Sequence, residues 1–196
     1  MLRYLIGNVV IAAFLLLFVL INIQAFRVTG EVGYILVAIN QSVYGMLFLA
    51  RKRAVATSTS AFDWGIAFAA TFLGTLLRPA HPLNAWLGDA LISIGIIINL
   101  ASVLFLNRSI GMVPAQRSIK TGGLYRYVRH PMYASEVLSL FGYTLANVSF
   151  ANAFIVISTA AFMLIRINRE ELFLSRSLAY QAYSIETRWK LLPFIY

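Results

Sequence analysis

The stretch of sequence that decides the fold lies near the N-terminus, where residues Leu5–Phe26 read LIGNVVIAAFLLLFVLINIQAF. A helix of about 22 residues rises roughly 33 Å, which is enough to cross the hydrocarbon core of a bilayer. The run is longer than the apolar region of a secretory signal, and no convincing small-residue cleavage site follows it. We therefore interpret it as a retained transmembrane helix.

Further apolar stretches follow along the chain, at Val32–Ala50, Phe62–Leu77, Trp86–Leu106 and Met132–Ile167. The last is about 36 residues long, which is too long for one span. Asn147, Ser149 and Asn152 lie near its middle and indicate a tight turn. The sequence therefore predicts a helical hairpin with arms near 132–147 and 151–170.

Together these stretches predict an all-α, polytopic integral membrane protein with about six transmembrane helices. We expect a single membrane domain over residues 1–196. Within it, residues 1–107 hold the N-terminal transmembrane helices. Residues 108–196 hold a polar loop, the helical hairpin and a C-terminal tail. This second part carries most of the Arg, Tyr, His and Glu residues that suggest chemistry.

Charged residues are scarce and mainly basic, at 12% of the chain with a formal net charge of +9. A soluble domain of ordinary composition holds about 25% charged residues. The basic residues follow the second, fourth and last predicted helices, so the positive-inside rule places both termini in the cytoplasm. The same rule explains the charge without nucleic acid, for which no basic arm or RNA-binding motif is present. The absence of cysteine excludes disulfides and thiolate chemistry.

Residues 121–133 form the first polar segment of interest and read TGGLYRYVRHPMY. The paired glycines allow a tight turn or a close approach of the backbone to a ligand. Pro131 suits the first turn of a helix, which would place His130 at or beside the N-cap, near free backbone N–H groups. The segment is either a ligand-binding loop that leads into a helix or a basic, aromatic anchor at the membrane surface. Composition alone favours the anchor.

Ionisable residues at the ends of the hairpin form the second group. Arg166 and Glu170 are four residues apart and share a helix face. They are either a cation and a carboxylate that face one cavity or a local salt bridge at the end of a span. Glu136 lies one turn into the first arm, where a carboxylate needs a partner. The two histidines, His81 and His130, lie far apart without a carboxylate cluster and do not suggest a metal site.

These segments together resemble the isoprenylcysteine carboxyl methyltransferase family, whose wider group includes phospholipid N-methyltransferases. The resemblance covers roughly residues 110–193. It rests on GLYRYVRHPMY at 123–133, the hydrophobic hairpin, Arg-x-x-x-Glu-Glu at 166–171, and Tyr180, Tyr183, Arg188 and Pro193 in the tail. It implies a membrane-embedded methyltransferase that uses S-adenosylmethionine in a cytoplasm-facing site.

The resemblance also implies roles for particular residues, with no metal. It assigns cofactor binding to Lys120, Tyr125, His130, Pro131, Met132, Tyr133 and Glu170. Gln116 is a candidate for a further polar contact to the cofactor. We expect Arg166 and Arg188 to bind substrate, and Arg166 and Glu171 to act in catalysis.

The methyl acceptor is expected to be lipophilic, and membrane lipids are the expected partners. If it is the carboxylate of a prenylated cysteine, Arg166 could orient it and no base is needed. If it is a phospholipid amine, the protonated nitrogen needs a base, for which Glu171 and Glu136 are the candidates.

Two other classes of protein also fit parts of the sequence. Arg129, His130, Tyr133 and Glu136 match a pattern of membrane sterol reductases, which would use NADPH. The chain is short for that family, and the adjacent Glu170 and Glu171 favour the methyltransferase. The remaining alternative is a membrane scaffold without catalytic activity.

Overall fold

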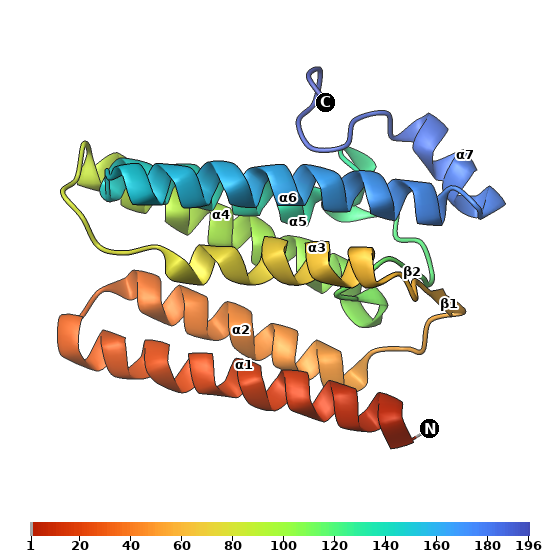
Figure 1. Cartoon of the computed structure of the whole chain (residues 1–196), viewed down its shortest axis with the longest axis horizontal. Helices are drawn as coiled ribbons and strands as arrows, with labels where there is room; N and C mark the ends of the chain where they lie inside the picture. Colours follow the sequence, from red (N-terminus) through yellow and green to blue (C-terminus); the bar gives the residue numbers. More distant parts are fainter. Residues whose placement is uncertain (1) are drawn as a thin grey trace.

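The computed structural model describes residues 2–196, with side chains from residue 5 onward, as a set of helices that run alongside one another (Figure 1). The helices are α1 (Leu2–Thr29), α2 (Val32–Ala50), α3 (Ala61–Phe72), α4 (Ala85–Leu106), α5 (Pro131–Ala146), α6 (Phe150–Leu174) and α7 (Leu178–Glu186). Three short 3-10 helices are η1 (Leu73–Leu76), η2 (Asn107–Ser109) and η3 (Gly123–Arg126). Two short strands, β1 (Ala56–Thr57) and β2 (Ala115–Gln116), pair antiparallel with Ala56 opposite Gln116.

Each predicted apolar segment forms a helix, and four helices within the described residues are long and apolar enough to cross a membrane. These are Leu5–Thr29, Val32–Ala50, Ala85–Ser109 and Phe150–Leu174. The other two segments form shorter helices, Ala61–Leu76 and Pro131–Ala146. The count of six complete spans and the side on which the termini lie stay predictions.

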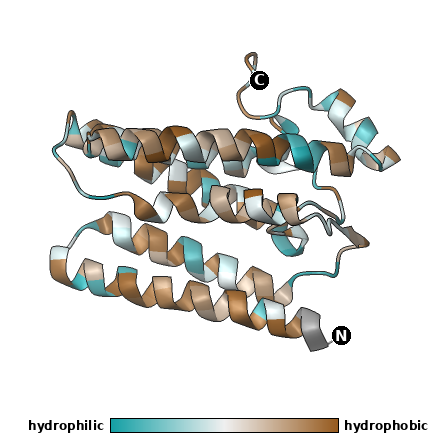
Figure 2. Ribbon diagram, viewed as in Figure 1, coloured by the Kyte–Doolittle hydropathy of each residue, from teal (hydrophilic) through white to brown (hydrophobic). Residues whose placement is uncertain are grey.

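The outer surfaces of the helices are apolar, as a bilayer requires. Figure 2 shows hydrophobic residues along the lengths of α1 and α6. On α6, Phe154 is 73% exposed and Ile157 is 69% exposed. A soluble protein rarely exposes such continuous apolar surface, whereas a lipid-facing helix does so at no cost. The chain is therefore an integral membrane protein.

The predicted hairpin is present, and its turn is built from the predicted polar residues. Pro131 begins α5, where its missing N–H leaves no helical hydrogen bond unmade. Ser149 caps α6 by accepting a hydrogen bond from the Asn152 backbone N–H at 3.1 Å. The buried Asn152 amide donates to the carbonyl oxygens of Arg78 and Asn147, both at 2.8 Å. The turn is thus tied to the loop that follows η1.

The connecting segments separate into two groups at opposite ends of the molecule (Figure 1). At one end, the Lys52 backbone N–H donates to the Arg108 carbonyl at 3.0 Å, and that of Arg129 donates to the Trp189 carbonyl at 2.9 Å. At the other end, the loop before α4 meets the hairpin turn, where Val148 N–H donates to a carbonyl of that loop at 2.9 Å. The three groups of basic residues found in the sequence therefore share one end.

The helices pack as close pairs, α1 with α2, α4 with α5 and α3 with α6, whereas α5 and α6 contact each other sparsely. Glycines allow the close approach of α4 and α5. A Cβ added to Gly88 would lie 2.7 Å from the Gly142 carbonyl oxygen, and one added to Gly142 would lie 2.7 Å from that of Gly88. The sparse contact between α5 and α6 leaves room for the polar side chains described next.

Candidate active site

The candidate site is centred on Glu170, which α6 presents at the end of the molecule where the basic segments gather. The Tyr133 hydroxyl, on the first turn of α5, donates to Glu170 Oε2 at 2.9 Å. Glu170 Oε1 accepts no hydrogen bond from the residues that the structure describes. Tyr125 in η3 is buried and interacts electrostatically with Glu170. Three of the predicted cofactor residues therefore lie together.

Arg166 lies one helical turn before Glu170 and fixes α6 to its neighbours. Its Nη1 donates to Thr71 Oγ1 of α3 at 3.1 Å, and its Nη2 donates to the Met112 carbonyl at 2.6 Å. The guanidinium carbon is 5.2 Å from the centre of the Tyr133 ring, a cation–π contact. Among the described ion pairs, none joins Arg166 to Glu170. Arg166 is therefore held by neutral acceptors and an aromatic face.

Both carboxylate oxygens of Glu171 have partners among the described residues. Its Oε1 lies 2.7 Å from His130 Nε2 and accepts a hydrogen bond from the Tyr180 hydroxyl at 2.7 Å. Its Oε2 forms an ion pair with Arg129 Nη1 at 2.8 Å. These contacts join the start of α5, the end of α6 and α7. Glu171 thus ties the C-terminal tail to the helices around Glu170.

The C-terminal tail packs over η3, and the tyrosines of α7 are buried in this contact. The Tyr183 hydroxyl donates to the Tyr125 carbonyl at 2.6 Å. Burial raises the pKa of Tyr183 to about 12. Burial also raises the pKa of Tyr125 and that of Tyr180, to which the hydrogen bond with Glu171 adds. All three phenols therefore stay protonated at neutral pH, so those of Tyr180 and Tyr183 keep their donor roles.

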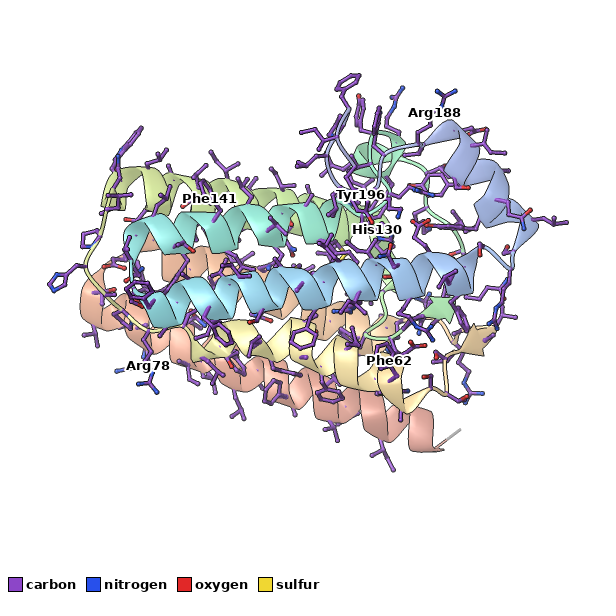
Figure 3. The ribbon with its side chains drawn as sticks, turned by 45° about the horizontal axis from the view of Figure 1, so that its top comes forward. Phe62, Arg78, His130, Phe141, Arg188 and Tyr196 are labelled. Carbon is purple, nitrogen blue, oxygen red and sulfur yellow. The ribbon has the colours of Figure 1, made fainter. Side chains whose placement is uncertain are left out.

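His130 occupies the position expected from the sequence, immediately before Pro131 at the start of α5. Its backbone N–H donates to the Lys190 carbonyl at 2.8 Å, and its ring stacks on Tyr133 with centroids 5.6 Å apart. In Figure 3, His130 lies towards the same end as Arg188, while Arg78 lies at the far end. His130 therefore helps to hold the side chains of Tyr133 and Glu171 in place, the first by ring stacking and the second by a polar contact.

Three predicted site residues lie away from Glu170. The Met132 side chain packs against an apolar cluster that contains Phe48 and Val103. Lys120 lines a small basic pocket, and Arg188 is exposed in a groove beside the tail. Within the described residues, no hydrogen bond or ion pair connects Lys120 or Arg188 to Glu170. The pocket also contains Lys52, Asn107, Arg108, Ser109 and Ser118.

Glu136 lies on α5, three residues beyond Tyr133, and is half-buried. It interacts electrostatically with Arg166, Tyr44 and Tyr133. Among the side chains that the structure describes, it has no hydrogen-bond or ion-pair partner. Gln116, the other residue considered at the sequence level, belongs to β2 and accepts a backbone hydrogen bond from Val55 at 2.8 Å.

Sequence reasoning missed the partner of one buried acid. Asp63 on α3 is only 4% exposed and forms an ion pair with Arg169 Nε at 2.6 Å. The Ser58 hydroxyl also donates to Asp63. An acid inside an apolar stretch signals that a partner exists, but it does not say which cation supplies the pairing. The pair fastens α3 to α6 beside Arg166 and Glu170.

Comparison with known families places this arrangement in a class of enzymes. A family model described as phospholipid methyltransferase matches residues 83–181, half of the chain, and this range includes α4, η3, α5 and α6. The chain therefore belongs to the phospholipid methyltransferase family. The wider group of integral membrane methyltransferases includes isoprenylcysteine-type members, so the resemblance seen in the sequence is confirmed at the level of that group. A comparison with curated proteins found no match.

Family membership decides between the classes considered from the sequence. The protein is an enzyme, a membrane methyltransferase, which sets aside the reductase and the scaffold. The reductase interpretation relied on Arg129, His130, Tyr133 and Glu136 as one group. In the structure, Arg129 and His130 bind Glu171 instead.

Proposed function

We propose that this protein transfers a methyl group from S-adenosylmethionine to a lipid acceptor, in a site between α5 and α6 at the basic end of the molecule. The observation that carries the proposal is Glu170, whose carboxylate is oriented by Tyr133 and keeps one oxygen without a partner in the described residues. This pair lies inside the range that matches the methyltransferase family.

The chemistry of the surrounding side chains fits such a cofactor. Glu170 Oε1 can accept hydrogen bonds from an ammonium group or a ribose hydroxyl. The rings of Tyr125 and Tyr133 suit an adenine or a cationic sulfonium, the latter by cation–π contact. Bound there, the cofactor would supply a methyl group on a positively charged sulfur. Methyl transfer mainly needs alignment and exclusion of water, which closely packed aromatic walls provide.

The neighbouring ionisable residues receive supporting roles. We propose that Glu171 is a positioning residue, because His130, Tyr180 and Arg129 already occupy both of its oxygens. Arg166 holds the space between α3 and α6 and presents positive charge to the acceptor side. The acceptor is either a phospholipid amine or the carboxylate of a prenylated cysteine, and these two make opposite demands on the site's charges.

Calorimetry with S-adenosylhomocysteine on the detergent-purified protein tests the proposal. The wild-type protein should bind this product. Glu170→Ala should lose about 1.5–3 kcal/mol of binding free energy, as expected for a charge-assisted hydrogen bond. Glu186→Ala removes a carboxylate from an exposed position on α7 and should bind like the wild type.

Two different results would contradict different parts of the proposal. A folded wild-type protein that does not bind the product would end the proposed function. Normal binding by Glu170→Ala would keep the function and move the cofactor site elsewhere.

A further inference from the structure

We infer that the small basic pocket beside the ends of α2 and α4 binds the phosphate group of an anionic membrane lipid that is not the methyl acceptor. The pocket is lined by residues that follow these two helices, namely Lys52, Asn107, Arg108, Ser109, Ser118 and Lys120. None of these lining residues is acidic. The pocket lies at the end of the molecule that holds β1 and β2 (Figure 1), and its proposed ligand takes no part in methyl transfer.

The backbone holds the three cations of the pocket close together. The Lys52 N–H donates to the Arg108 carbonyl at 3.0 Å, which joins the chain after α2 to the chain after α4. Beyond Lys52 the chain forms β1, which pairs with β2 between Arg108 and Lys120. The hydroxyl oxygens of Ser109 and Ser118 are 2.7 Å apart and close the loop that carries β2. These contacts fix the positions of the cations, but they neutralise none of the charges.

The described residues supply no counter-charge to these three cations. Their ion pairs all involve other basic residues. The ammonium groups of Lys52 and Lys120 have no hydrogen-bond partner in the described part of the chain. Arg108 Nε donates to the Ala50 carbonyl at 2.5 Å, whereas its two Nη groups have no described partner. Like charges that share a pocket repel one another, so a bound anion would stabilise this arrangement.

Asn107 turns the chain sharply at the end of α4, immediately before Arg108. It has a φ of 52° and a ψ of −134°, a backbone conformation that residues with a side chain rarely adopt. Such strain is often found where a binding site needs a particular geometry. The exposed Asn107 amide has no hydrogen-bond partner among the described residues, so its N–H groups can bind an anion together with the cations.

The size and the donors of the pocket suit a phosphate group. Its volume is about 180 Å³, below the roughly 300–1,000 Å³ of sites that enclose a whole small molecule. Ammonium and guanidinium groups bind phosphate oxygens through charge-assisted hydrogen bonds. The same cations would repel the positively charged sulfur of S-adenosylmethionine. Lys120, which the resemblance assigns to the cofactor, therefore receives a different ligand here.

Exposed apolar side chains near the pocket favour a lipid as the source of the phosphate. Leu49, in the last turn of α2, is 53% exposed, and Leu104, in the last turn of α4, is 54% exposed. Both helices are long and apolar enough to cross a membrane, so Lys52 and Arg108 follow them at the depth of the lipid headgroups. Basic residues at this position attract anionic lipids. A lipid could place its phosphate in the pocket and its acyl chains along the apolar helix ends.

Native mass spectrometry of the protein in a neutral detergent tests the site with short-chain phosphatidylglycerol. This lipid carries a phosphate and one net negative charge, and it has no amine to methylate. Phosphatidylcholine with the same chains carries the same phosphate without net charge. We expect saturable binding of phosphatidylglycerol, about tenfold or more tighter than that of phosphatidylcholine, because the pocket holds three positive charges.

Substitutions of single basic residues locate the binding. Lys52→Gln removes one exposed cation of the pocket and should weaken phosphatidylglycerol binding about fivefold, whereas Lys52→Arg should retain most of the affinity. Arg176→Gln is the matched control, because it removes an exposed positive charge that lies outside the pocket, in the turn between α6 and α7. It should bind like the wild type. Lys120→Gln has the same expected loss and carries the test if Lys52→Gln does not fold.

Three results would overturn the inference. Equal affinity for phosphatidylglycerol and phosphatidylcholine would mean that the pocket does not select an anion. Equal losses in Lys52→Gln and Arg176→Gln would mean that the lipid responds only to the overall positive charge. Inorganic phosphate that displaces phosphatidylglycerol at a concentration equal to that of the lipid would identify a free anion as the ligand. None of these measurements uses methyl transfer, so they stay informative if the proposed function fails.

Discussion

At the scale of single residues, Glu170 and Glu171 are neighbours in sequence but point in different directions. Successive residues of a helix are rotated by about 100°, so two adjacent acids cannot face the same partners. Glu170 faces Tyr133 and keeps an oxygen without a partner in the described residues, whereas Glu171 faces the tail and binds Arg129, His130 and Tyr180. Under the proposed function, Glu170 binds the ligand and Glu171 gives structural support.

This division predicts opposite effects of two neighbouring substitutions. Glu171→Ala leaves the Arg129 guanidinium with little solvent and no ion-pair partner, and it removes the carboxylate that contacts His130, since these two side chains are 11% and 6% exposed. Breaking such a buried pair costs about 3 kcal/mol. Thermal unfolding in detergent should therefore show a clearly lower midpoint for Glu171→Ala. Glu170→Ala is the matched control and should unfold near the wild-type midpoint, and equal stability of the two variants would refute the division.

Part of the candidate site could be predicted from the sequence. The RHPMY and Arg-x-x-x-Glu-Glu segments predicted that Tyr133 and Glu170 belong to one site, and the structure brings them into contact. It did not predict the ion pair of Arg129 with Glu171, because Arg129 was considered only as a basic loop residue and as part of the sterol reductase pattern. The identity of a charge's partner depends on helix rotation and on the path of the tail, and neither is encoded in local spacing.

At the scale of elements, hydropathy predicted the positions of the long helices because lipid requires continuous apolar runs. It did not predict α7, which has only nine residues and a mixed surface from Leu178 to Glu186. The β1–β2 pairing joins segments about 60 residues apart in sequence, and its strands are two residues long. Such contacts follow from how the helices pack, so a local pattern cannot reveal them.

The close packing of α4 on α5 predicts sensitivity at one glycine. A Cβ at position 142 would lie 2.7 Å from the Gly88 carbonyl oxygen and 2.9 Å from the Ile92 backbone nitrogen. Both obstacles are backbone atoms, so the two helices must separate to admit a methyl group. Gly142→Ala should therefore destabilise the protein by about 1–3 kcal/mol, the usual cost of overpacking. Thermal unfolding in detergent measures the effect.

Gly65→Ala is the control for this prediction. A Cβ at Gly65 in α3 would meet nothing within 4 Å. Alanine is also the better helix former, so this variant should be as stable as the wild type or slightly more stable. Equal behaviour of the two alanine variants would mean that α4 and α5 do not meet through Gly142.

At the scale of the whole molecule, the chain passes back and forth between two ends, and every basic cluster lies at one of them (Figure 1). The positive-inside rule predicts that this end faces the cytoplasm. The shorter helices raise the question of how they fit the bilayer. The 16 residues of α5 rise about 24 Å, which is less than the roughly 30 Å of hydrocarbon. Local thinning of the bilayer, or the turn that flanks α5, would have to account for the difference between the length of α5 and the hydrocarbon thickness.

The placement of the basic segments also predicts how the chain crosses the membrane. We expect six membrane crossings with both termini in the cytoplasm, because the basic segments that share one end should all remain on the positive side. Reporter fusions should place Ser58, Ser118 and the C-terminus in the cytoplasm, and Thr29, His81 and Ser149 on the opposite side. Reporters at Ser58 and Ser118 on opposite sides would refute six crossings. That result would also separate the 51–58 segment from the 108–116 segment, which the Lys52–Arg108 backbone hydrogen bond joins at 3.0 Å.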